Sequence, residues 1–204
     1  MIETKSIDLD LPLKQVGDVI HFTRSDDRCW AGIIDLPAWG KLSILPDQRN
    51  EFYVLKGSLI NHTGPSYTNG TFLGLTGDAL FSSGAEGARL FAYRDSKPSS
   101  ATPCIVMPDK LKWHEGGVPS MQATTLHHTV TDLLLVSWVR GTQMHFHDHP
   151  LGEEFFVLMG ELCDERGRYK AGTWQRLHPG TGHAPYAETD TLILLRNGHL
   201  YSRQ

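Results

Sequence analysis

Three histidines, His145, His147 and His149, occupy alternate positions in the second half of the chain, and Glu153 follows four residues after the last of them. In an extended strand this spacing places the three imidazoles on one face. A short turn after His149 would bring the strand that Glu153 opens back beside them. Imidazole nitrogens and a carboxylate around one point are the donors that bind Zn, Fe, Mn, Cu or Ni.

The alternative interpretation is a cluster of surface histidines on a hairpin, which would chelate a metal only by accident. A fourth candidate ligand, His183, argues against it, because this histidine follows in a second segment of matching pattern. The role of His145 stays open at this stage. Its side chain fits a group that transfers a proton beside the metal, a substrate contact, a fourth imidazole or a hydrogen-bonded histidine of the core.

The composition excludes several classes of protein. The 204 residues carry a net charge of -4 and no cluster of Lys or Arg, so a nucleic-acid partner is not expected. Cys29, Cys104 and Cys163 are isolated, which disfavours a disulfide framework or a cysteine zinc site and fits a reducing compartment. No stretch has the length of a signal-peptide core or a membrane span, so we expect a cytoplasmic protein with no membrane partner.

Short apolar runs separated by 20 glycines and 11 prolines predict an all-β fold made of many short strands. Residues 132–140 are almost continuously apolar, so we expect a strand that is covered on both faces. Residues 94–104 are polar and contain proline, which predicts a linker. We place this linker at residues 95–106, between an N-terminal domain at 1–94 and a C-terminal domain at 107–204.

An internal repeat supports two copies of one β-domain. Residues 50–57, Asn-Glu-Phe-Tyr-Val-Leu-Lys-Gly, align with residues 153–160, Glu-Glu-Phe-Phe-Val-Leu-Met-Gly. Each copy would have about 100 residues, an ordinary size for a small domain. In the same register the four candidate ligands fall on residues that bind metals poorly, namely Ile44, Pro46, Asn50 and Phe81. We therefore expect one metal site per chain, in the second copy, and a structural role for the first.

The second copy resembles the cupin family. The first motif of that family is present without a gap, as Gly141, five residues, His147-x-His149, three residues, Glu153, six residues and Gly160. The second motif spans residues 172–183 and ends in His-Pro-Gly-Thr-Gly-His. It departs from the usual pattern at His178, where the family has proline, and the family's following asparagine is Ala187 here. Neither change removes a ligand.

This resemblance implies a fold of two tandem cupin barrels, each a double-stranded β-helix or jelly roll. It implies that the metal ligands are His147, His149, Glu153 and His183. It also makes a homodimer the expected assembly.

More narrowly, residues 153–173 and 183–185 are similar to the cupin domain of ChrR-type anti-sigma factors, and the likeness covers about residues 113–196. That subfamily is also similar to diketone-cleaving dioxygenases, so the resemblance implies a fold and a metal site but not one activity. ChrR-type factors hold a sigma factor through a helical N-terminal domain with a His-x-x-x-Cys-x-x-Cys zinc site. This sequence has no such motif, so sigma-factor binding is not expected.

Our first prediction of function is a metalloprotein with two cupin copies that binds one divalent ion, Fe, Zn, Mn, Ni or Cu, in its C-terminal barrel. It would act on a small molecule as a dioxygenase-like enzyme. The alternative is a ChrR-like sensor or binding module, in which metal and ligand occupancy alter a protein interface without catalysis. A storage protein with a vestigial site is disfavoured, because all four candidate ligands are present.

Overall fold

The computed structural model describes residues 1–14, 16–44, 46, 48–62, 64–77, 80–95, 102–128 and 131–200, apart from the side chain of His128. Within these ranges the chain is almost entirely β, with one short 3₁₀ helix, η1 (Pro108–Lys110). The structure therefore confirms the predicted all-β class. No helix in the described ranges is long and apolar enough to cross a membrane.

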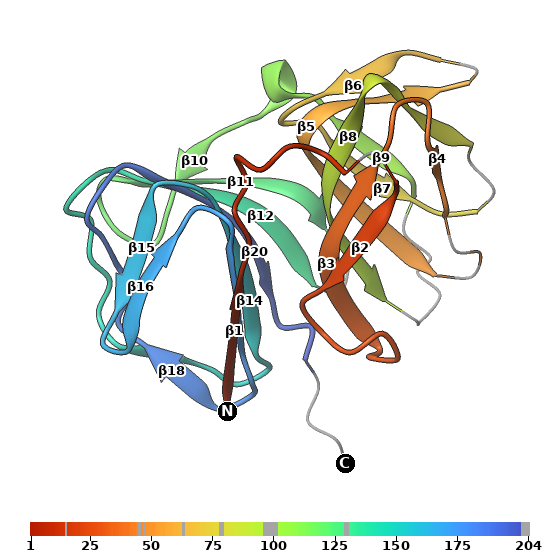
Figure 1. Ribbon diagram of the computed structural model, residues 1–204. Coiled ribbons are helices and arrows are strands. Elements are labelled where there is room, and N and C mark those ends of the chain that lie inside the picture. Colours follow the sequence, from red (N-terminus) through yellow and green to blue (C-terminus); the bar gives the residue numbers. More distant parts are fainter. Residues whose placement is uncertain are drawn as a thin grey trace. The chain divides into compact units, whose positions relative to one another are not determined.

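The chain forms two compact units (Figure 1). Unit 1 comprises Met1–Asp10 and Lys112–Gln204, and unit 2 comprises Leu11–Leu111. These units differ from the predicted domain boundaries at the N-terminus, where β1 (Ile2–Ser6) pairs antiparallel with β17 (Thr173–Leu177). The sequence did not indicate this pairing, because it joins segments from opposite ends of the chain.

The predicted linker at 95–106 lies partly outside the described residues, which omit 96–101. At its end, Cys104–Val106 forms β9, and this strand pairs with β7 (Phe72–Leu75) of unit 2. The last residues of the predicted linker are therefore part of the sheet of unit 2.

Unit 1 contains a seven-stranded sheet in the order β1-β17-β14-β20-β12-β11-β10 and two small sheets, β13-β18 and β16-β15-β19. The bounds of its remaining strands are β10 His114–Glu115, β11 Met121–His128, β12 Asp132–Trp138, β13 His147–His149, β14 Glu153–Met159, β15 Glu161–Asp164, β16 Gly167–Lys170, β18 Thr181–His183, β19 Tyr186–Ala187 and β20 Thr191–Asn197.

The alternation of side chains along β14 connects the core of unit 1 to its candidate site. Phe155 and Val157 lie in the apolar core, together with residues such as Leu177 and Ile193. Because side chains two residues apart in a strand share a face, Glu153 points to the same interior. The strand therefore places one carboxylate at the end of an apolar row.

Unit 2 contains an eight-stranded sheet with the main order β2-β3-β8-β5-β7-β9, to which β4 adds beside β8 and β6 beside β5. The bounds of its other strands are β2 Asp18–His21, β3 Cys29–Leu36, β4 Lys41–Leu42, β5 Arg49–Asn61, β6 Ser66–Thr68 and β8 Phe81–Asp95. Its interior is a cluster of buried apolar side chains that includes Phe52, Val54 and Phe81.

The two units repeat the same strand pairing. Tyr53 lies opposite Phe72 in unit 2, as Phe156 lies opposite Trp174 in unit 1. The repeat extends to a pair of glycines, Gly57 with φ 73° and Gly160 with φ 78°. A Cβ on either glycine would lie 2.1 Å from a backbone oxygen, so only glycine fits both turns.

Candidate metal centre

Two short strands place three of the predicted ligands. In the sheet formed by β13 and β18, His147 lies directly opposite His183, and His149 lies opposite Thr181. The strands approach closely because residue 182 is a glycine, where a Cβ would lie 2.4 Å from the carbonyl oxygen of His147. The strand pairing therefore brings the two motifs together in space.

A turn after β13 places the fourth residue. The amide of Gly152 donates to the carbonyl of His149 at 3.0 Å, and Gly152 has a φ of 78° that favours glycine. Glu153 follows as the first residue of β14 and is buried. The chain thus reverses over three residues and returns the carboxylate to the histidines.

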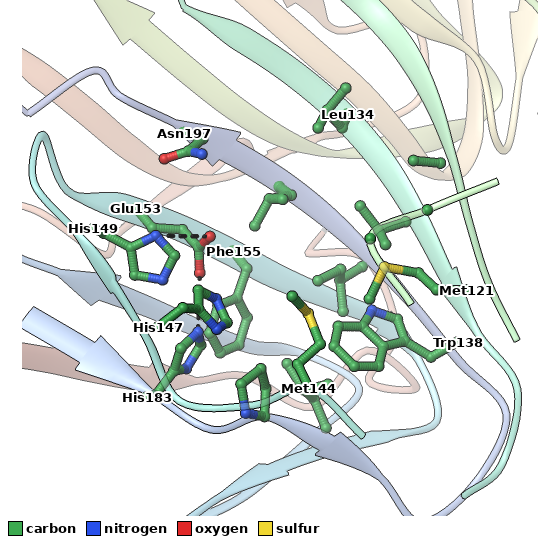
Figure 2. Close-up of a pocket in the computed structure, with 18 of the residues that line it drawn as sticks. Met121, Leu134, Trp138, Met144, His147, His149, Glu153, Phe155, His183 and Asn197 are labelled. Atoms are coloured by element: carbon green, nitrogen blue, oxygen red, sulfur yellow. Dashed lines mark ion pairs between the residues drawn. The ribbon is translucent and has the colours of Figure 1, made fainter. Parts of the chain in front are cut away.

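The three imidazoles form one group (Figure 2). His147, His149 and His183 each offer a ring nitrogen within 4.8 Å of the other two. The carboxylate oxygens of Glu153 lie 3.4 Å from Nδ1 of His149 and 3.5 Å from Nε2 of His183. The structure thus brings together all four residues that the sequence predicts as ligands.

Burial shifts the ionisation of this group. It lowers the pKa of His149 to about 4, with a further contribution from the neighbouring imidazoles, and it lowers the pKa of His183 to about 4 as well. Burial also raises the pKa of Glu153 to about 8. The lowered pKa values favour neutral imidazoles, the form that binds a metal ion, whereas the raised pKa of Glu153 favours its protonated form, so an ion bound to Glu153 would displace that proton. Nε2 of His149 is buried and has no hydrogen-bond partner among the described residues, as expected for a donor that serves a ligand.

A backbone carbonyl orients His147. Its Nδ1 lies 2.9 Å from the carbonyl oxygen of His145. Because a carbonyl oxygen can only accept, Nδ1 carries the proton in this contact, and Nε2 keeps its lone pair. This is the tautomer that a metal ligand requires.

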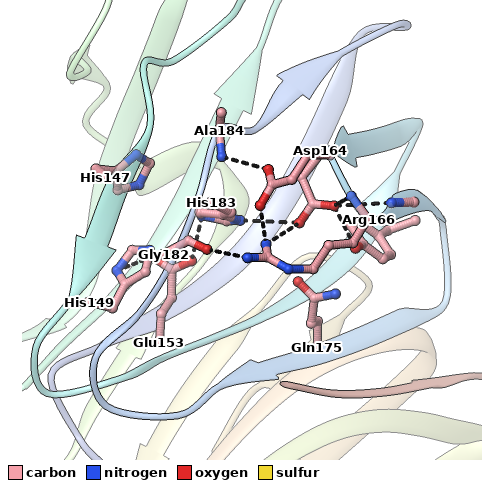
Figure 3. A network of polar contacts seen from close by, with 12 residues as sticks. His147, His149, Glu153, Asp164, Arg166, Gln175, Gly182, His183 and Ala184 are labelled. Carbon is pink, nitrogen blue, oxygen red and sulfur yellow. Dashed lines mark hydrogen bonds and ion pairs between the residues drawn. The ribbon is translucent and has the colours of Figure 1, made fainter. Parts of the chain in front are cut away.

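A buried carboxylate stands behind His183 (Figure 3). Oδ2 of Asp164 lies 3.6 Å from Nδ1 of His183, on the side of the ring away from Glu153. Oδ1 of Asp164 accepts hydrogen bonds from the Tyr169 hydroxyl at 2.8 Å and from the amide of Arg166 at 2.7 Å. The carboxylate is therefore held in place by the hairpin of β15 and β16, facing the ring of the ligand.

The same hairpin holds the backbone on both sides of His183. Nη2 of Arg166 donates to the carbonyl oxygen of Gly182 at 2.7 Å. The amide of Ala184 donates to the carboxylate of Glu165 at 3.0 Å. The link of this hairpin to His183 could not be seen in the sequence, because strand pairing creates it.

The structure does not bring the side chain of His145 into the group. This residue is exposed, precedes β13 and does not line the cavity beside the histidines. The regular alternation that would have turned it inward begins only at His147. Its observed contribution is its backbone carbonyl. His178 also lies apart from the ligands, since its Nε2 is 2.6 Å from Oε1 of Glu3.

A cavity of about 340 Å³ adjoins the four candidate ligands. Figure 2 shows His147, His149, His183 and Glu153 at one side, with Met121 and Trp138 at the other. The rest of the lining is largely apolar and includes Leu134, Val136, Met144, Phe155, Leu162 and Ile193. A small molecule in this cavity would therefore contact the polar group at one end and apolar walls elsewhere.

Comparison with known proteins agrees with this architecture. Residues 101–201 match the family described as the ChrR Cupin-like domain. The whole fold is similar to a putative dioxygenase from Nostoc punctiforme, with a TM-score of 0.73 at 13% identity over 99% of this chain and 85% of that one. It is also similar to a cupin 2 conserved barrel domain protein from Leptotrichia buccalis, with a TM-score of 0.69 at 15% identity over 96% and 95%.

A third similar structure is the salicylate 1,2-dioxygenase of Pseudoaminobacter salicylatoxidans, with a TM-score of 0.61 at 11% identity over 84% of this chain and 71% of that one. A search of the curated proteins gave no significant match. At these identities the structural neighbours establish the fold alone.

The fold and the histidine group are those of a cupin-like barrel in unit 1, and unit 2 repeats its strand pairing. The match to the ChrR Cupin-like domain family covers residues 101–201 and therefore the unit that holds the histidines.

Proposed function

We propose that unit 1 holds one divalent transition-metal ion on His147, His149, His183 and Glu153. The observation that carries this proposal is the group of three imidazole nitrogens within 4.8 Å of one another, with the carboxylate beside two of them. Imidazole and carboxylate donors suit Fe, Zn, Mn, Ni and Cu alike, so the donor set does not select one metal.

We further propose that the protein acts on a small molecule, as a dioxygenase-like enzyme. Two of the similar structures are named as dioxygenases, which supports this reaction class. A bound ion in such a site supplies Lewis-acid or oxygen chemistry at positions that the protein leaves open. The residues of this chain would orient the substrate against the histidine end, and the apolar walls would exclude water from it.

Elemental analysis of the purified, tag-free protein tests the metal site. One Fe, Mn, Ni or Cu per chain supports the proposal and leads to oxygen-consumption assays over a panel of small molecules. One Zn per chain supports the site but favours a sensor or a hydrolytic reaction. Two ions per chain, or none after reconstitution with each metal, would contradict the proposed site.

A second candidate function, a sensor without turnover, draws support from the surface beside the ligands. Phe146 and Leu151 flank β13 and are 67% and 50% exposed, respectively. Exposed apolar side chains next to a metal site are suited to a protein interface that responds to occupancy. A metal-loaded protein that consumes no oxygen with any compound of the panel, but changes its binding of another protein, would favour this function.

The cytoplasmic location, the homodimer and the supporting role of unit 2 stay predictions. Sedimentation of the metal-loaded and metal-free protein would test the assembly. A monomer under both conditions would contradict the homodimer.

A further inference from the structure

The cavity beside the candidate ligands has no Lys and no Arg among its described lining residues. Apart from the histidines, its ionisable groups are acidic, namely Glu153 at the ligand end and Asp148, which is exposed. The remaining walls are mostly apolar, with two flexible thioethers, Met121 and Met144. Methionines fill irregular gaps and adapt to the shape of a ligand.

This distribution of charge restricts what the cavity can hold. Imidazoles that bind a metal are neutral, so they supply no positive charge of their own. Positive charge would be present only where the ion sits, at one end of the cavity. A carboxylate or phosphate held against the apolar walls would lose water without gaining a counter-ion, which is unfavourable.

We propose that the cavity takes a largely apolar molecule that presents one or two oxygen donors at the histidine end and carries no charged group elsewhere. This inference rests on the proposed metal site and adds the class of ligand. A molecule with a second anionic group that reaches the apolar walls is excluded.

Substitution of either of two leucines could reverse the proposed preference of the cavity for ligands without a second anionic group. Leu134 of β12 and Leu195 of β20 are cross-strand partners, and both line the cavity. Both are partly exposed, so they lie on its open side, where a longer polar side chain can be accommodated. An arginine at either position would supply the missing counter-ion for an anionic group.

The test uses two probes with the same chelating group, benzohydroxamic acid and 4-carboxybenzohydroxamic acid. Their dissociation constants are measured on the Co(II)-loaded protein, by calorimetry and by the visible absorption of the ion. We expect the probe without the carboxylate to bind at least about 30-fold more tightly, because the described lining offers the added carboxylate no Lys or Arg as a counter-ion. In Leu134→Arg or Leu195→Arg the ratio should fall to about threefold or reverse, whereas Leu134→Met should retain it.

Equal affinity of the two probes for the unmodified protein, or tighter binding of the carboxylated one, would overturn the inference. So would a metal-loaded protein that binds neither probe. Metal content is measured separately in every sample. A protein that binds no metal at all refutes the proposed site itself, whereas a loaded protein with the wrong probe preference refutes only the ligand class.

Discussion

Units 1 and 2 share a scaffold but differ inside it. In both, the long central strand is interrupted at the same place, between Val157 and Met159 in β14 and between Val54 and Lys56 in β5. A bulge at an equivalent position in two copies is a feature of the fold and does not depend on the metal site. The bulge therefore does not distinguish the copy that holds the candidate ligands from the other.

The interiors differ at the positions that matter for metal binding. Where unit 1 has His183, unit 2 has Phe81, which is buried in the apolar core and lies with its ring 6.1 Å from that of Tyr67. Where unit 1 has Glu153, unit 2 has Asn50, which is fully buried. In the same register Asn61 stands where unit 1 has Asp164. Unit 2 thus has neither the histidine nor the carboxylate behind it.

A buried carboxylate that forms an ion pair with an arginine occurs at a similar place in both units. Glu154 forms an ion pair with Arg176, its cross-strand partner, and Glu51 forms one with Arg49. All four side chains are buried. Because the pair occurs in the unit without candidate ligands as well, we assign Glu154 to the scaffold. The comparison teaches that the barrel and the site are separable, and the following predictions test this separation.

The largest effect is expected for His183→Phe, which gives unit 1 the residue of unit 2. Loss of one of three imidazoles should weaken metal binding by at least about a hundredfold. The metal-free protein should still fold but unfold at a slightly lower temperature, because the aromatic ring fills the place of the imidazole but leaves Oδ2 of Asp164 without the Nδ1 that faces it at 3.6 Å.

Metal competition with a chelator and thermal unfolding without metal measure the two results. His114→Ala, which removes an exposed histidine of unit 1, is the matched control and should change neither. Full metal occupancy in His183→Phe would refute the site. A collapse of the metal-free fold would show that barrel and site are not separable.

A smaller loss is expected for Glu153→Gln. This change keeps the size of the side chain and one oxygen donor but removes the negative charge that would face the ion. If the imidazoles dominate, metal affinity should fall by about thirtyfold, less than for loss of a histidine. The same chelator competition, run at one pH for both variants, gives the ranking. A loss equal to or greater than that of His183→Phe would refute it.

Asp164→Asn should have a more modest effect. Its carboxylate faces Nδ1 of His183 at 3.6 Å, so the asparagine removes a charge that favours the proton on that nitrogen and orients the ring. Loss of such a partner lowers metal affinity by about tenfold or more. Glu188→Gln, which removes an exposed carboxylate paired with Arg168, should leave the affinity unchanged. Equal losses in both variants would indicate a general effect of charge and not the positioning of His183.

The sequence predicted the candidate ligands because their spacing is local. Alternate residues in a strand share a face, and the pattern around His147 and Glu153 needs only one turn. His183 was found through its motif. The same argument failed for His145, because alternation holds only within a regular strand and β13 begins two residues later.

What the sequence could not predict is non-local. The contact of Asp164 with His183 depends on how the β15 hairpin lies against β18, which no spacing encodes. The pairing of β1 with β17 joins opposite ends of the chain, and it moves the first ten residues into unit 1. The cavity walls come from several separate strands, so the absence of Lys and Arg from the described part of the lining becomes visible only after folding.

The smallest effect on metal binding is expected for Asn50→Glu, which places the carboxylate of unit 1 in unit 2. No second site should form, because Ile44 and Phe81 remain where imidazoles would be needed. Metal content should stay at one ion per chain.

The free energy of unfolding of Asn50→Glu should fall by about 2 kcal/mol, since Asn50 is fully buried and the new carboxylate would be desolvated there. Elemental analysis and denaturant unfolding measure the two quantities. A second equivalent of metal would mean that one carboxylate suffices to make a site in this barrel, and that the apolar interior of unit 2 is not what keeps it free of metal.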